Sequence, residues 1–198
     1  MIAIVDYGAG NIRSVKRALD HLGLESQVTR DPEFVRSADK VLLPGVGHFA
    51  ATAQLASSGL RDAICETVQQ GKPFLGVCVG MQWLFSGSEE APGTPGAALL
   101  PGVCERFPST IKVPHVGWNS IDVVGRSRLL EGIERGAFVY YTHSYRVPIC
   151  TDTVAVTEYD GAFAAVVERE NVFGVQFHPE KSGEAGLRML RNFGDTKC

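Results

Sequence analysis

The sequence predicts an α/β fold, a doubly wound, mostly parallel sheet with helices on both faces and a β-rich antiparallel second half. In the first half, short apolar runs alternate with segments whose apolar residues recur at helical spacing. This alternation is typical of parallel strands joined by crossover helices. After residue 86, a loop rich in Gly and Pro leads into short β-rich runs, which indicate antiparallel strands. We expect one domain over residues 1–198.

The first half begins with an expected strand at 2–6, a glycine loop, and a helix from residue 12 with Asn11 as candidate N-cap and Gly23 as stop. Further strands are expected at 26–30, 40–45 and 73–78, helices at 48–59 and 60–71, and a helical start at 79–87. In the second half we expect a loop at 86–102, strands at 120–124, 138–145, 153–159, 163–168 and 172–177, and a final helix at 183–193.

The composition argues against several classes of function. Hydrophobic residues make up 44% and charged residues 21% of the chain, as is ordinary for a soluble globular protein. The net charge of −3 and the lack of a Lys/Arg cluster argue against a nucleic-acid binder. No apolar run is long enough for a membrane span, and the N-terminal segment lacks the basic region of a signal peptide.

The cysteines predict free thiols, because they are odd in number, widely spaced and without a C-x-x-C pair: Cys65, Cys78, Cys104, Cys150 and Cys198. Free thiols fit the reducing cytoplasm. No metal site is expected from the scattered histidines His21, His48 and His115. No glycine loop completes a G-x-G-x-x-G pattern, and we expect no cofactor.

The stretch GVCVGMQ, residues 76–82, carries the candidate nucleophile Cys78. A G-x-C-x-G pattern between an apolar strand and a helix is the cysteine form of the nucleophile elbow, a tight turn that presents its central residue above the sheet. A helix N-terminus behind the sulfur favours the reactive thiolate. Free cysteine is also among the most buried residue types, so the pattern alone leaves a plain core cysteine as the commoner explanation.

A thiol nucleophile needs a base, and the base needs an orienting partner. The stretch VQFHPEKS supplies His178 at the end of an expected strand and Glu180 two residues later. Pro179 biases His178 toward extended geometry, in which residues two apart point to the same side. The carboxylate can then orient the imidazole. Considered alone, the tripeptide also fits a solvated strand end.

The stretch LLPGVGHF, residues 42–49, ends an expected strand in a glycine-rich loop. Such a loop exposes backbone N–H groups, which an oxyanion hole requires. We expect the N–H groups of Val46 and of Val79, the residue after the nucleophile, to form this hole. An ordinary strand-to-helix turn explains the segment equally well in isolation.

Together these segments resemble the triad-type (class I) glutamine amidotransferases, in which G-x-C-x-G-x-Q holds the nucleophile and a late H-P-E supplies the other two triad members. Within that family, the likeness is greatest to the glutaminase subunits of imidazole glycerol phosphate synthases. The matching segments span nearly the whole chain: DYGAGNIRSV, LPGVGHF, GVCVGMQ, SEE at 88–90, VPHVGWN, YYTHSY and GVQFHPEKS. Val79, where leucine is common, is a departure that changes no functional group.

The resemblance implies that L-glutamine is hydrolysed to glutamate and ammonia through a thioester. Cys78 is then the nucleophile, His178 transfers the proton and Glu180 orients His178. The resemblance also implies contacts with the substrate from Gly45, Gln82, Ser144 and Tyr145.

The resemblance further implies a partner, a separate (β/α)8-barrel cyclase subunit that uses the ammonia in histidine biosynthesis. Its products are imidazole glycerol phosphate and aminoimidazole-carboxamide ribonucleotide. The residues that match the docking face of this heterodimer are Asn11, Trp118, Tyr140 and Lys181. Three alternatives stay open: another amidotransferase branch such as the one serving pyridoxal phosphate synthesis, a scaffold subunit without activity, and a cysteine-dependent peptidase or hydrolase.

Overall fold

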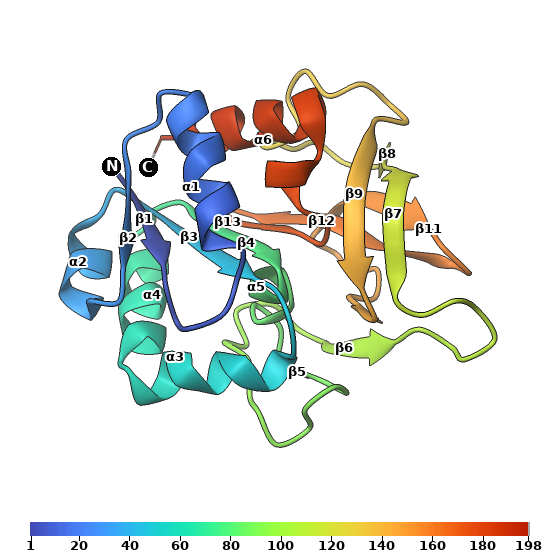
Figure 1. Ribbon diagram of the computed structural model, residues 1–198, viewed down its shortest axis with the longest axis horizontal. Helices are drawn as coiled ribbons and strands as arrows, with labels where there is room; N and C mark the ends of the chain where they lie inside the picture. The colour runs from blue at the N-terminus through green and yellow to red at the C-terminus, as the bar shows by residue number, and fades with distance from the viewer. Residues whose placement is uncertain (198) are drawn as a thin grey trace.

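The computed structural model describes residues 1–197, and its centre is an eight-stranded sheet in the order β2-β1-β3-β4-β13-β12-β11-β8 (Figure 1). Its strands are β1 (Ile2–Val5), β2 (Ser26–Thr29), β3 (Lys40–Gly45), β4 (Phe74–Cys78), β8 (Asp122–Val123), β11 (Thr153–Glu158), β12 (Ala162–Arg169) and β13 (Val172–Val175). Pairing is parallel from β2 through β13 and antiparallel from β13 to β8. The predicted class is confirmed.

Helices cover both faces of this sheet, with α1 and α6 above it and α3 and α4 below it in Figure 1. The α-helices are α1 (Ile12–His21), α2 (Pro32–Ser37), α3 (Ala53–Ser57), α4 (Leu60–Gln69), α5 (Val79–Gln82) and α6 (Gly183–Asp195), and the 3-10 helices are η1 (Phe49–Thr52) and η2 (Pro179–Lys181). None of these helices, of which α6 is the longest at 13 residues, is long and apolar enough to be a membrane span.

Two small sheets lie outside the main sheet. One is a three-stranded sheet made of β5 (Gly87–Ser88), β6 (Val103–Arg106) and β10 (Tyr145–Arg146). The other is an antiparallel ribbon of β7 (His115–Ser120) and β9 (Phe138–His143), at the right of Figure 1. In the ribbon Trp118 lies opposite Tyr140, and His115 opposite His143.

Several elements differ from the sequence predictions, among them the short strands β5 and β6, which were not expected. Strand β7 lies where no strand was expected, because only two apolar residues, Val116 and Trp118, alternate with polar residues and glycine in this segment. Helix α2 was not expected either, and its signals are the cap at Asp31, whose side chain accepts from the Glu33 N–H, and Pro32 in its first turn. The helical start expected at 79–87 is the single turn α5, after which the chain forms turns.

Candidate active site

Cys78 lies at the junction of β4 and α5, in a backbone conformation that few side-chain-bearing residues adopt. Its φ is 54° and its ψ is −109°, and such strain persists only when the surrounding structure enforces it. Two glycines enforce the turn. A methyl group at Gly76 would lie 2.4 Å from the Gly80 carbonyl oxygen, and one at Gly80 would lie 2.1 Å from the Leu43 carbonyl oxygen. Neither position has room for a side chain.

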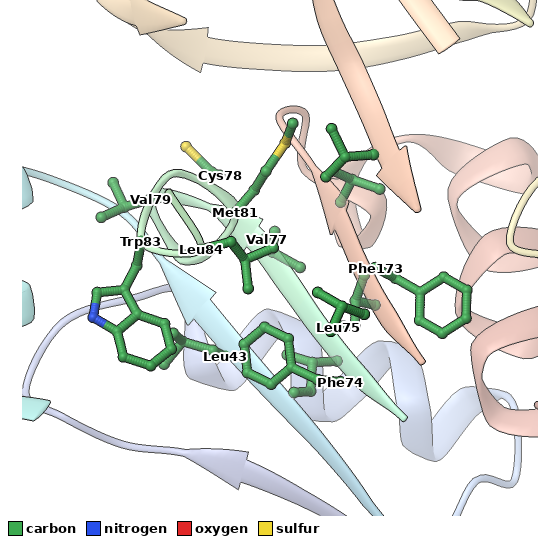
Figure 2. Packing of buried hydrophobic residues seen from close by; sticks show 14 of the residues in the cluster. Leu43, Phe74, Leu75, Val77, Cys78, Val79, Met81, Trp83, Leu84 and Phe173 are labelled. Atoms are coloured by element: carbon green, nitrogen blue, oxygen red, sulfur yellow. The ribbon is translucent and has the colours of Figure 1, made fainter. Parts of the chain in front are cut away.

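Packing fixes this junction from below. Figure 2 shows Phe74, Leu75 and Trp83 in the apolar cluster under the junction, with the Cys78 sulfur pointing away from Phe74 and Trp83. These three side chains are buried, and Cys78 itself is only 2% exposed. The elbow is therefore seated on the core while its sulfur faces the carboxyl edge of the sheet.

Parallel pairing of β4 with β13 brings the late His-Pro-Glu segment to the same edge. Val77 pairs with Val175, so Cys78 and the residues after β13 emerge side by side. His178 Nδ1 lies 3.0 Å from Glu180 Oε1, and both side chains are fully buried. The same carboxylate oxygen accepts from Asn11 Nδ2 at 3.1 Å. Asn11 thus makes no capping hydrogen bond to α1, contrary to the sequence expectation.

The route by which Glu180 reaches His178 differs from the expected one. His178 is extended, but the chain does not continue as a strand, because Pro179 begins the 3-10 turn η2. The carboxylate therefore reaches the imidazole across a tight turn and not by strand alternation. The backbone N–H of His178 donates to the Tyr140 carbonyl oxygen at 2.9 Å. The backbone N–H of Tyr140 donates to Ser182 Oγ at 3.0 Å. Strand β9 therefore holds both ends of this turn.

The electrostatics of the pair favour an imidazolium. Burial favours the neutral ring, but the Cys78 sulfur and the Glu180 carboxylate outweigh it and raise the pKa of His178 to about 10. Nε2 of His178 is buried and makes no hydrogen bond to the described residues. Nε2 therefore keeps a position free for proton transfer.

A cavity of about 310 Å³ opens over the sulfur. Its lining residues are Val46, Gly47, Cys78, Val79, Gln82, Glu90, Pro114, Thr142, His143, Ser144 and Tyr145. The predicted residues Val46, Val79, Gln82, Ser144 and Tyr145 thus gather around Cys78. Gly45 is buried and outside this lining. A methyl group at Gly45 would lie 2.5 Å from the Gly80 nitrogen, so Gly45 permits the close approach of β3 to α5.

Several residues at this site were not singled out from the sequence. Glu90 lines the cavity, and its Oε2 accepts from the Phe49 N–H at 2.7 Å. Thr142 and His143 also line it. Gln176 is completely buried and places its Nε2 3.6 Å from the Cys78 sulfur. Glu90 stands in the quoted SEE segment, but no pattern in the sequence singles out Gln176.

The expected docking residues lie beside the His-Glu pair. Trp118 is 55% exposed and packs edge-on against Tyr140 at 6.0 Å between ring centroids. Lys181 Nζ lies 5.6 Å from the centroid of the Tyr140 ring. Cys65, Cys78, Cys104 and Cys150 are free thiols, and Cys198 lies outside the described residues. Residues 1–197 contain no group of three or more His, Cys, Asp or Glu arranged to hold a metal ion.

Comparison with known proteins defines the class first. The model of the class-I glutamine amidotransferase family matches residues 3–196, and the chain belongs to this family. Within it, the chain belongs with the HisH subunits of imidazole glycerol phosphate synthase. It is 48% identical to that subunit of Methanothermobacter thermautotrophicus, over 98% of this chain and 97% of the relative. It is 49% identical to that of Moorella thermoacetica, over 98% and 94%. The family predicted from the motifs is confirmed.

Solved structures agree on the fold. A crystal structure of a glutamine amidotransferase superposes with a TM-score of 0.77 at 20% identity, covering 98% of this chain and all of that one. A structure of PurLQS from Thermotoga maritima gives 0.78 at 22% identity, covering 97% and 96%. At these identities the likeness concerns the fold alone.

Proposed function

We propose that this chain is a single class-I amidotransferase domain, residues 1–198, that hydrolyses L-glutamine and passes the ammonia to a cyclase subunit. The observation that carries the proposal is the buried His178–Glu180 pair, with Nδ1 and Oε1 3.0 Å apart, beside a cysteine held at a φ of 54°. The 48% identity to a HisH subunit supports the same activity. A nucleophile, a base and an orienting carboxylate are the groups that thioester chemistry needs.

The raised pKa of His178, about 10, keeps an imidazolium in the site, and a positive charge favours the thiolate from which we propose that the reaction begins. The Cys78 sulfur attacks the carboxamide carbon of glutamine, and the carbonyl oxygen becomes an oxyanion. His178 gives its proton to the amide nitrogen, the C–N bond breaks and ammonia leaves. Water then gives a proton to His178 and attacks the thioester. The thiolate leaves, so glutamate is released and the starting pair is restored.

The cavity suits the α-amino acid end of the substrate. Glu90 places a carboxylate where it can attract the α-ammonium group. Ser144 and Tyr145 lie on the wall where the resemblance expects the α-carboxylate. Gln82 offers its carboxamide oxygen, because both hydrogens of its NH₂ group already bond to Tyr145 O and Gln176 Oε1, each at 3.0 Å. We assign the oxyanion to the N–H groups of Val46 and Val79.

The partner we propose is the separate (β/α)8-barrel cyclase. It forms a heterodimer with this chain and converts the ammonia into imidazole glycerol phosphate and aminoimidazole-carboxamide ribonucleotide. Trp118, Tyr140, Lys181 and Asn11 are the proposed docking residues. They surround the turn that holds His178 and Glu180, so a partner seated there would lie next to the leaving ammonia. We place the complex in the cytoplasm, where four free thiols stay reduced.

The test is glutamine hydrolysis with the cyclase and its nucleotide present. Cys78→Ala is expected to lower turnover to background while the melting temperature stays that of a folded protein. Cys65→Ala, on the remote helix α4, is the matched control and should keep turnover. A folded Cys78→Ala variant with normal turnover would show that another group is the nucleophile.

A further inference from the structure

One fully buried polar side chain touches the reacting sulfur and has no role in the mechanism above. Gln176 follows β13 and is 0% exposed. Its Nε2 lies 3.6 Å from Cys78 Sγ, and its Oε1 lies 3.0 Å from Gln82 Nε2. Buried amides keep their hydrogen bonds because an unmade one is costly. The identity of the atom facing the sulfur therefore matters, since an NH₂ group donates and a carbonyl oxygen does not.

A backbone carbonyl fixes this identity from the far end of the network. The Tyr145 carbonyl oxygen can only accept hydrogen bonds. It has two neighbours, His143 Nδ1 at 2.8 Å and Gln82 Nε2 at 3.0 Å. Gln82 must therefore turn its NH₂ group toward Tyr145, and His143 must carry its proton on Nδ1. The amide orientation of Gln82 and the tautomer of His143 are thus assigned from the hydrogen-bond partners of these side chains.

The assignment propagates to the sulfur. The second hydrogen of the Gln82 NH₂ group points to Gln176, so Gln176 must present its carbonyl oxygen there. Its own NH₂ group then faces Cys78. The His143 arm is fixed in the same way, because its Nε2 accepts from His115 Nδ1 at 3.0 Å. Burial lowers the pKa of His143 to about 3 and that of His115 to about 4, so both rings stay neutral.

We propose that Gln176 is a catalytic residue that donates a hydrogen bond to the Cys78 sulfur and stabilises the thiolate before glutamine is attacked. Hydrogen bonds to a charged acceptor are about twice as strong as neutral ones. The donor is held in direction by Gln82 and the Tyr145 carbonyl, so it needs no reorganisation when charge develops. The inference rests on the proposed function only in taking the Cys78 thiolate as the nucleophile.

The experiment measures the rate of iodoacetamide alkylation of Cys78 against pH, followed on the Cys78 peptide by mass spectrometry. Gln176→Met removes the donor at similar volume, and the midpoint of the profile should rise by about 1 pH unit, the scale of one hydrogen bond to a charge. Gln176→Glu turns the donor into a carboxylate and should raise it further. Gln70→Glu adds the same charge at the exposed end of α4 and should leave it unchanged.

An unchanged midpoint in folded Gln176→Met would overturn the proposal. A measurement on the unmodified protein covers variants that fail to fold: the ¹⁵N resonance of the Gln176 side-chain amide should titrate with the Cys78 midpoint, and a resonance indifferent to that titration would equally overturn it. Alkylation requires no glutamine turnover, so these outcomes are separate from failure of the proposed function. If Cys78 is alkylated as expected but the protein hydrolyses no glutamine, the hydrogen bond from Gln176 is supported and the proposed glutaminase function is refuted.

Discussion

Burial lowers the pKa of each of the three histidines near the site, but the partners of each ring decide the net shift. His178 has a carboxylate and a sulfur beside it, which raise its pKa to about 10 against the effect of burial. His143 and His115 have no carboxylate partner, so burial lowers the pKa of each, to about 3 and about 4, and the charges of His178 and Arg146 lower that of His143 further. One ring is thus kept charged for chemistry, while two are kept neutral to anchor the Tyr145 carbonyl.

This pair of neutral histidines predicts a loss of stability in mild acid. In the unfolded chain a histidine has a pKa of about 6.5, so below that pH the unfolded state binds more protons than the folded one. The stability that the pair contributes is complete above pH 6.5 and is lost as pH falls toward 4. The slope should approach about 1.4 kcal/mol per pH unit for each histidine. His178 adds nothing to this slope. The stability that its raised pKa contributes is complete below pH 6.5 and is lost only as the pH rises toward 10.

Urea unfolding at pH 7, 6 and 5 measures this slope. The variant His143→Gln should flatten it by removing one proton-binding site from the unfolded state. His48→Gln, at an exposed histidine, is the control and should leave the slope unchanged. A stability that stays constant from pH 7 to pH 5 would contradict the neutral, buried state of the pair.

At the scale of elements, the turn between β4 and α5 requires glycine at positions 76 and 80, because a side chain at either position would clash with the backbone. Gly80→Ala would place a methyl group 2.1 Å from a carbonyl oxygen of β3. Overpacking of this kind typically costs about 1–3 kcal/mol. We expect a lower free energy of unfolding and slower alkylation of Cys78, both measurable in one preparation. Gly93→Ala is the control, because a methyl group there meets nothing within 4 Å. A Gly80→Ala variant as stable as the control would refute this account of the elbow.

The elements that bear the triad could be predicted because their signals are local. An apolar run ending in G-x-C-x-G indicates β4 and its turn, and the run before His178 indicates β13. Strand β7 could not be predicted, because its pairing with β9 is set by cross-strand contacts between residues 18 to 28 positions apart. Helix α2 has six residues and too few apolar positions to show a period.

The contacts of individual site residues were harder to predict than the elements. Gln176 stands in a run of apolar residues and its role depends on Gln82, 94 residues earlier. Gly45 was expected to contact substrate, and no sequence pattern shows that it also allows the close approach of Val79 and Gly80. Asn11 was expected to cap a helix, but its side chain bonds Glu180. Each of these contacts joins segments that only the folded sheet brings together.

At the scale of the whole molecule, strand β9 contacts both the proposed docking residues and the turn that carries the imidazole of His178. The side chains of Trp118 and Lys181 pack against the Tyr140 ring. The Tyr140 backbone accepts a hydrogen bond from the His178 N–H and donates one to Ser182 Oγ. A partner that shifts β9 would therefore act directly on the turn that positions the base. A partner seated on the proposed docking face would therefore contact the strand that holds this turn.

Trp118→Ala tests this face. Exposed tryptophans at the centre of an interface commonly contribute about 2 kcal/mol or more, so the dissociation constant for the cyclase should rise about 30-fold. The melting temperature of the free chain should hardly change, because Trp118 is 55% exposed. Val28→Ala, on the edge strand β2 at the other end of the sheet, is the control. Equal affinities of the two variants would move the docking face elsewhere.

The most direct test of the central claim is to trap the covalent intermediate. The complex with the cyclase and its nucleotide is mixed with glutamine labelled in its carbon chain, quenched in acid during turnover and digested. We predict labelled γ-glutamyl on the peptide containing Cys78, bound through sulfur and released by mild base. Label on another residue, or steady glutamate production with no labelled peptide, would contradict a thioester at Cys78.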